Sequence, residues 1–132
     1  MRPGPERHRT RERALEILYE AHIKGRDARE VLAALPVAPD PYASVLVTSA
    51  EDHRERAEGL ITDCAIGWPL ERIALVDRLV MTLAVGEMLL ADPPPLAVIL
   101  DEAVELAKMF STEGSASFVN GVLATLARRL SD

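Results

Sequence analysis

The stretch LERIALVDRLVMTLAVGEMLLA (residues 70–91) constrains the fold most, because its central part is apolar on every side of a helix. A helix that is hydrophobic all round is stable in water only when other protein elements surround it. The prolines of DPPP (92–95) then end the apolar run,. We therefore expect residues 75–91 to form a central helix that the rest of the chain buries.

The rest of the chain shows helical periodicity, with apolar residues recurring every three or four positions,. No strand-like alternation competes with it, and aromatic residues make up only 4%, which suits a core of interleaved aliphatic side chains. The predicted fold class is all-α, with six or seven helices in a single domain over residues 1–132. The first helix is expected from about Thr10 to a C-cap at Gly25, and the others span 27–35 (N-cap Asp27), 42–65, 75–91, 95–110 and 118–130 (N-cap Ser115),.

Charge is distributed unevenly along the chain. Residues 1–13 hold five arginines and two glutamates, a net charge of +3, whereas the remainder holds 10 basic and 19 acidic residues, a net charge of −9. One interpretation is that residues 1–9 are a disordered, solvated basic arm. The other is contact with nucleic acid at one end of an acidic protein, because a phosphate strand responds to local rather than total charge.

The arginines do not all lie on one side of the first helix. At about 100° per residue, Arg7 and Arg11 share a face with the apolar stripe through Ala14, whereas Arg9 and Arg13 point elsewhere,. An unpaired charge is too costly to bury. The helix therefore either begins after Arg7 and Arg11, or aims them at something anionic, or pairs them with acids of the chain such as Glu51.

The last helix contains FVNG (118–121), which places two weak helix formers in its middle. Gly121 lies opposite the predicted core stripe, where glycine costs roughly 1 kcal/mol relative to alanine,. Close approach of a backbone or a ligand would justify it. A tight crossing with another helix of the same chain and contact with a partner are both compatible with this pattern.

The residues of catalytic and metal sites are missing from the sequence. His8, His22 and His53 show no ligand spacing, and one cysteine, Cys64, cannot build a thiolate zinc site,. No glycine-rich phosphate loop occurs,. We therefore expect neither an enzyme nor a bound metal or cofactor. Trp68 is expected to close an edge of the core, and Tyr19, on a flank of the first helix, is expected to pack or to stack on a base.

The same features indicate a cellular location. A single cysteine excludes an intrachain disulfide, and no signal peptide or membrane-spanning run is recognisable,. We expect a soluble cytoplasmic protein that does not contact membranes.

Three segments together resemble the NusB family of transcription antitermination factors: RHRTRERALEILYE, GWPLERIALVDRLVM and VILDEAVELAKMFSTEGSASFVNGVL. They cover nearly the whole chain in the family's order. DEAVELAKMF followed by FVNGVL is the most specific part. The resemblance implies two small helical bundles that share a long helix, and a role that is not enzymatic.

The resemblance also implies partners. Family members pair with NusE (the ribosomal protein S-ten) and bind the single-stranded boxA element of nascent RNA, notably in ribosomal RNA transcription. Other elongation factors and RNA polymerase would be engaged indirectly. The implied RNA-binding residues come from the arginine-rich start and from the loop leading into FVNG, namely Arg7, His8, Arg9, Arg11, Arg13, Tyr19, Ser115, Phe118 and Asn120.

The central helix departs from the family pattern, and a rival interpretation remains. Thr82 and Gly86 stand where the family has an arginine and a tyrosine, so contacts assigned to that region do not transfer; Asp101 replaces a family asparagine. The rival is a helical protein–protein adaptor, or a self-associating homodimer with little RNA binding. In that case the arginines would contact acidic protein surface and Gly121 would mark an interface.

Overall fold

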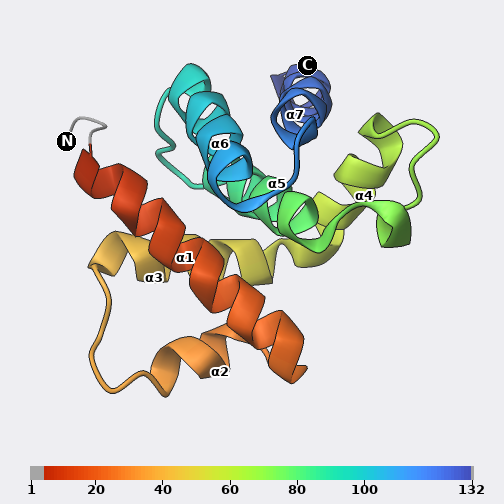
Figure 1. Ribbon diagram of the computed structural model, residues 1–132. Coiled ribbons are helices and arrows are strands. Elements are labelled where there is room, and N and C mark those ends of the chain that lie inside the picture. Colours follow the sequence, from red (N-terminus) through yellow and green to blue (C-terminus); the bar gives the residue numbers. More distant parts are fainter. Residues whose placement is uncertain (1–4, 132) are drawn as a thin grey trace.

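A computed structural model describes residues 5–131, and these residues form seven α-helices and one short 3₁₀ turn, with no strand among them (Figure 1). Arg2 and the rest of residues 1–4 of the predicted basic arm lie outside the described residues. The helices are α1 (Pro5–Lys24), α2 (Ala28–Ala33), α3 (Pro41–Asp52), α4 (Arg54–Cys64), α5 (Leu75–Met88), α6 (Leu96–Phe110) and α7 (Ser115–Ser131), with the turn η1 at Leu70–Arg72.

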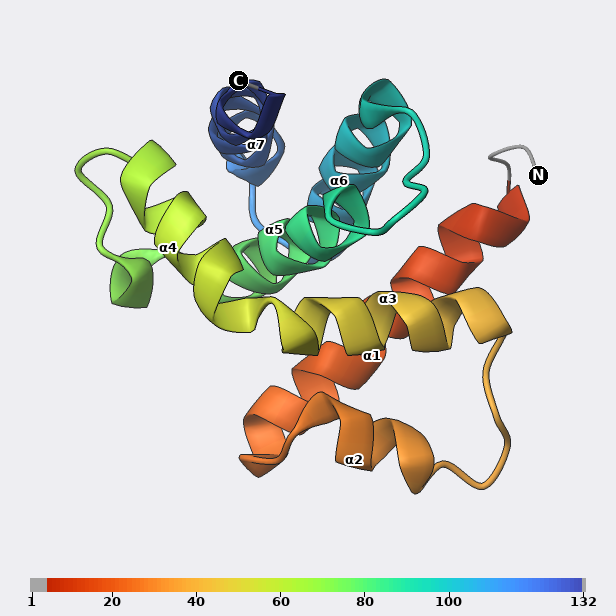
Figure 2. The same ribbon diagram turned by 180° about the vertical axis from the view of Figure 1, so that it is seen from behind.

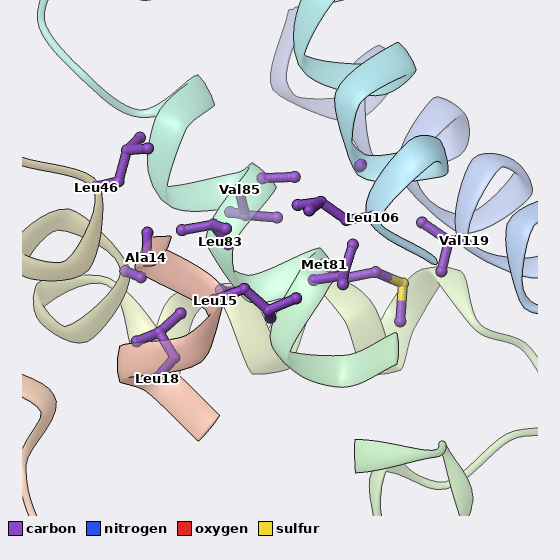
Figure 3. Packing of buried hydrophobic residues seen from close by; sticks show 14 of the residues in the cluster. Ala14, Leu15, Leu18, Leu46, Met81, Leu83, Val85, Leu106 and Val119 are labelled. Atoms are coloured by element: carbon purple, nitrogen blue, oxygen red, sulfur yellow. The ribbon is translucent and has the colours of Figure 1, made fainter. Parts of the chain in front are cut away.

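Helix α5 is the centre of the fold, as its composition predicts. Its eight consecutive residues from Val80 to Glu87 are all buried. Helices α1, α2 and α3 pack together on one side of it, and α4, α6 and α7 pack on the other (Figures 1 and 2). The two-bundle arrangement implied by the family resemblance is therefore present, with α5 shared by both. Figure 3 shows side chains of α1, α3, α6 and α7 meeting around α5.

The first helix begins earlier than its apolar stripe indicates. Helix α1 begins at Pro5 instead of near Thr10, so all of residues 5–9 are helical. Its other end agrees with the prediction, since Gly25 has a φ of +64° and the Arg26 N–H donates to the Ala21 carbonyl at 2.9 Å,. The arginines from Arg7 onward are thus held on a regular helix.

The predicted single helix over residues 42–65 is wrong, because it is broken at His53 into α3 and α4. An unbroken helix would extend the buried positions Val47 and Ala50 through residue 54 to Ala57. Residue 54 is Arg54, whose side chain is mostly exposed. A bend at His53 (φ −104°, ψ 14°) turns that guanidinium to solvent while Ala57 and Ile61 remain buried.

Two glycines occupy opposite environments. A Cβ on Gly86 of α5 would lie 2.9 Å from the Ala50 nitrogen, and the Gly86 carbonyl accepts a 2.7 Å hydrogen bond from Ser49 Oγ. The close backbone approach is therefore between α3 and α5. At Gly121 a Cβ would meet nothing within 4 Å. Of the two alternatives left open for this glycine, a tight crossing with another helix of the same chain is therefore not observed.

No helix of residues 5–131 is long and apolar enough to cross a lipid bilayer.

We expect Gly86→Ala to lower the free energy of unfolding by about 1–3 kcal/mol, because the new methyl group pushes α3 away from α5. Gly121→Ala is the matched control and should raise it by about 0.5–1 kcal/mol, since alanine favours a helix in open space. Urea denaturation of both variants measures this. Equal effects of the two substitutions would contradict the close approach of α3 and α5.

Candidate nucleic-acid interface

The arginines of α1 occupy different environments. Arg9 is exposed, and Arg13 has a side chain that is 42% exposed and pairs with Glu16 of its own helix at 3.2 Å. Arg7 is half-buried, whereas Arg11 is only 2% exposed. The predicted angular split is therefore confirmed: Arg9 and Arg13 face outward, and Arg7 and Arg11 face the rest of the fold.

Arg11 makes a bidentate ion pair with Glu87 inside the protein. Its Nε donates to Glu87 Oε1 at 2.9 Å and its Nη2 to Oε2 at 2.7 Å, while Nη1 lies 3.3 Å from Glu102 Oε1. Burial alone would lower the pKa of Arg11, but hydrogen bonding and the charge of Glu87, with help from Glu102, raise it,. The guanidinium therefore stays charged in the interior.

The expectation that Arg11 contacts RNA is corrected by this burial. A side chain enclosed by two carboxylates is not presented to a ligand at the surface. Of the three options for an arginine on the core stripe, pairing with an acid of the chain is the one observed. The partner is Glu87 instead of Glu51, which accepts the Ala28 N–H at 2.8 Å and contacts Arg54.

Tyr42, at the start of α3, connects Arg11 to Arg7. Its hydroxyl donates to Glu87 Oε2 at 2.6 Å, and its ring lies under the Arg7 guanidinium, 3.6 Å from the guanidinium carbon to the ring centroid. Burial and the hydrogen bond to Glu87 raise the pKa of Tyr42 to about 12, so the phenol is neutral and donates.

His8 lies beside this cluster. Its Nδ1 is 2.8 Å from Glu102 Oε2, and its Nε2 is 2.9 Å from Glu12 Oε1 and 3.3 Å from the Met109 sulfur. Helices α1 and α6 are thus joined by His8 and Glu102 next to the buried pair. His8 is half-buried and held by acids of the chain.

The residues predicted near FVNG are only partly at the surface. Ser115 is buried, and its hydroxyl donates to Asp77 Oδ2 at 2.9 Å; Ser111 donates to the other oxygen of Asp77 at 2.5 Å. The sequence predicts Ser115 as the N-cap residue that precedes the last helix, whereas helix α7 begins at Ser115 itself. Its buried hydroxyl anchors the α6–α7 loop to α5 and is not presented to RNA, which corrects that expectation.

Phe118 and Asn120 both belong to α7, where they lie on the two flanks of buried Val119,. Phe118 is half-buried, with its ring centroid 5.8 Å from that of Trp68 in an edge-on arrangement, and Asn120 is exposed. Trp68 is 51% exposed, so the expectation that it closes a core edge is wrong. The two rings form an aromatic pair at the surface.

Tyr19 is 44% exposed and lines an apolar hollow of about 340 Å³ between α1, α5 and the end of α6. Its other lining residues are Leu15, Glu16, Val76 and Phe110. Phe110 is 42% exposed, so two aromatic rings border this hollow. The hollow can take a planar base or an apolar side chain of a partner.

Sequence reasoning missed Tyr42, Glu87 and Glu102 as members of this cluster. A signal existed, because Glu87 lies within the apolar run of the central helix and Arg11 lies on an apolar stripe. Each charge needs a buried counter-charge.

Among residues 5–131, no group of three or more His, Cys, Asp or Glu side chains could hold a metal ion.

A sequence model of the NusB family matches residues 8–128. The chain belongs to the NusB family. This family consists of transcription antitermination factors and is not known as an enzyme family. The transcription antitermination protein NusB of Acidothermus cellulolyticus is 44% identical over 126 residues, which cover 92% of this chain and 87% of that protein.

Solved structures of NusB proteins have the same fold. Thermotoga maritima NusB is 30% identical and superposes with a TM-score of 0.83, covering 97% of this chain and 93% of that one. A chain from the structure of the antitermination factors NusB and NusE in complex with double-stranded RNA is 25% identical, with a TM-score of 0.78 and coverage of 93% and 96%. These similarities place the all-α fold within the NusB family.

We expect Arg11→Met to lower the free energy of unfolding by about 3–5 kcal/mol, because it leaves the carboxylate of Glu87 buried without its counter-charge. Replacing both partners with Arg11→Met and Glu87→Leu should recover much of that loss. Arg13→Met, on the exposed pair with Glu16, is the control and should change stability by less than about 1 kcal/mol. A loss from Arg11→Met no larger than that from Arg13→Met, in urea denaturation, would contradict the buried pair.

Proposed function

We propose that this chain is an RNA-binding antitermination factor that pairs with NusE and binds boxA-type single-stranded RNA in nascent transcripts, in the cytoplasm. The observation that carries the proposal is the outward projection of Arg9 and Arg13 from the start of α1, beside Arg7 stacked on Tyr42. A structural relative was solved together with NusE and RNA, which supports the same classes of partner here.

The charge distribution favours binding at one end of the molecule. The net charge of −9 after residue 13 repels a polyanion, whereas the arginines of α1 attract it,. The start of α1 lies at the edge of the molecule, so a strand can reach it without crossing the acidic body (Figure 2). Phosphates would bind the exposed arginines, and this contact gives affinity without reading the sequence.

Bases need a second kind of surface. Single-stranded RNA exposes unstacked bases, which proteins hold by stacking on aromatic rings and by hydrogen bonds to base edges. Phe118 with its neighbour Trp68 offers rings, and exposed Asn120 offers an amide. We place base recognition there and phosphate recognition at Arg7, Arg9 and Arg13.

We infer that NusE binds an apolar surface separate from the one that binds RNA. The hollow bordered by Tyr19 and Phe110 has mostly apolar walls and lies between the two bundles. Exposed aromatic side chains of this kind are common anchors of protein interfaces. We therefore propose this hollow as the NusE-binding surface, which transfers Tyr19 from the predicted RNA site to the protein partner.

We expect Arg9→Ala with Arg13→Ala to weaken boxA RNA binding and to reduce the slope of log affinity against log salt by about 1.4, at roughly 0.7 per phosphate of a single strand. Fluorescence anisotropy with boxA and scrambled RNA, each with and without NusE, measures this. Arg128→Ala with Arg129→Ala removes the same charge from the exposed end of α7 and is the matched control.

The outcomes separate the proposal from its rival. Equal affinity for boxA and scrambled RNA would contradict base recognition at Phe118 and Asn120. Equal losses from both double substitutions would contradict phosphate binding by α1. A tight homodimer in light scattering that excludes RNA would favour the adaptor interpretation. Tyr19→Ala should reduce only the increase in RNA affinity that NusE brings, and Ile23→Ala on the same helix is the control. A lower RNA affinity of Tyr19→Ala in the absence of NusE would instead place Tyr19 in the RNA site.

A further inference from the structure

Tyr42 is held at both ends. Its backbone N–H donates to Asp40 Oδ1 at 2.8 Å, which caps the start of α3. Its hydroxyl donates to Glu87 Oε2 at 2.6 Å, and Glu87 is itself held by the bidentate pair with Arg11. The position and the long axis of the phenol ring are therefore set by the interior of the protein, where Tyr42 of α3 meets Glu87 of α5 and Arg11 of α1.

The face of this ring is covered by Arg7. Its guanidinium carbon lies 3.6 Å from the ring centroid, at the distance of a cation–π stack,. Arg7 and Arg11 are one helical turn apart. Arg7 contacts the face of the Tyr42 ring, whereas Arg11 binds the Glu87 carboxylate that accepts the Tyr42 hydroxyl. Stacking uses the flat face of a guanidinium, whereas phosphate oxygens are bound by N–H groups in its plane.

We propose that Tyr42 is a positioning residue for RNA binding: its ring orients the guanidinium of Arg7 for a phosphate of the RNA backbone. The proposal deepens the function proposed above and rests on it. A free arginine must lose side-chain freedom when it binds, and a side chain already oriented loses less. The buried pair of Arg11 and Glu87 thus acts on the RNA contact through Tyr42, without touching RNA itself.

The test is a double-mutant cycle between Arg7→Ala and Tyr42→Leu, read by anisotropy with boxA RNA. Each single substitution should weaken binding by about three- to tenfold, and the double variant should be no weaker than Arg7→Ala alone. Tyr42→Leu should also reduce the salt slope by about 0.7, as Arg7→Ala does. Tyr42→Phe keeps the ring but loses the hydroxyl bond to Glu87, so it should weaken binding less than Tyr42→Leu does,.

A second pair of variants leaves Tyr42 in place. Arg7→Lys keeps the charge but loses the planar stack, so it should weaken binding by at least about threefold, whereas Arg9→Lys on the exposed side should be nearly neutral. Val45→Ala removes an exposed side chain from the same helix, α3. It is the control for changes in RNA affinity that come from altering this helix in general. Circular dichroism confirms that each variant is folded.

The results separate this proposal from the function on which it rests. Additive losses in the cycle, a Tyr42→Phe variant as weak as Tyr42→Leu, or equal effects of Arg7→Lys and Arg9→Lys would overturn the role of Tyr42 while RNA binding stands. Failure of the unmodified protein, with or without NusE, to prefer boxA over scrambled RNA would overturn both. Losses that do not add, with a reduced salt slope, would support both.

Discussion

The buried pair of Arg11 and Glu87 is the constraint on which the rest of the structure depends. Neither charge is tolerable alone in the interior, so α1 and α5 must keep the register that joins them. The same carboxylate accepts the hydroxyl of Tyr42 from α3, and the same guanidinium reaches Glu102 of α6. One ion pair therefore connects four helices, including members of both bundles.

This constraint explains how a short segment combines two roles. Along α1, Arg11 is buried, Arg7 is half-buried against the ring of Tyr42, and Arg9 and Arg13 face outward, so the arginines are divided between the interior and the surface. The buried pair of Arg11 and Glu87 fixes how α1 packs on the core, and that packing determines where the other arginines are presented. A basic end on an acidic protein is then a defined surface on a helix that extends back to Pro5, which suits the RNA role proposed for this member of the NusB family.

Local chemistry in the sequence predicts much of this fold, but not its long-range contacts. Periodicity locates the helices, and the apolar run around Val85 predicts the central one because such a helix has no stable place at a surface. The bend at His53 could not be predicted from the sequence, because no glycine or proline marks it and the apolar stripe continues beyond it. Arg11 and Glu87 were each recognisable as misplaced charges, but 76 positions separate them, so only the packing of α1 on α5 identifies the partner. For the same reason Gly86, not Gly121, proved to be the site of close approach: helix propensity marks a costly glycine, and only the neighbouring helix shows why it is needed.

The most direct test of this division of the arginines is the Nε–Hε region of an NMR spectrum, recorded while boxA RNA is added. We expect the signals of Arg7, Arg9 and Arg13 to shift or broaden, while that of Arg11 stays in place because its Nε–H is bonded to Glu87. Shifts confined to Arg128 and Arg129 at the other end of the chain, or a shift of Arg11 as large as that of Arg9, would contradict it.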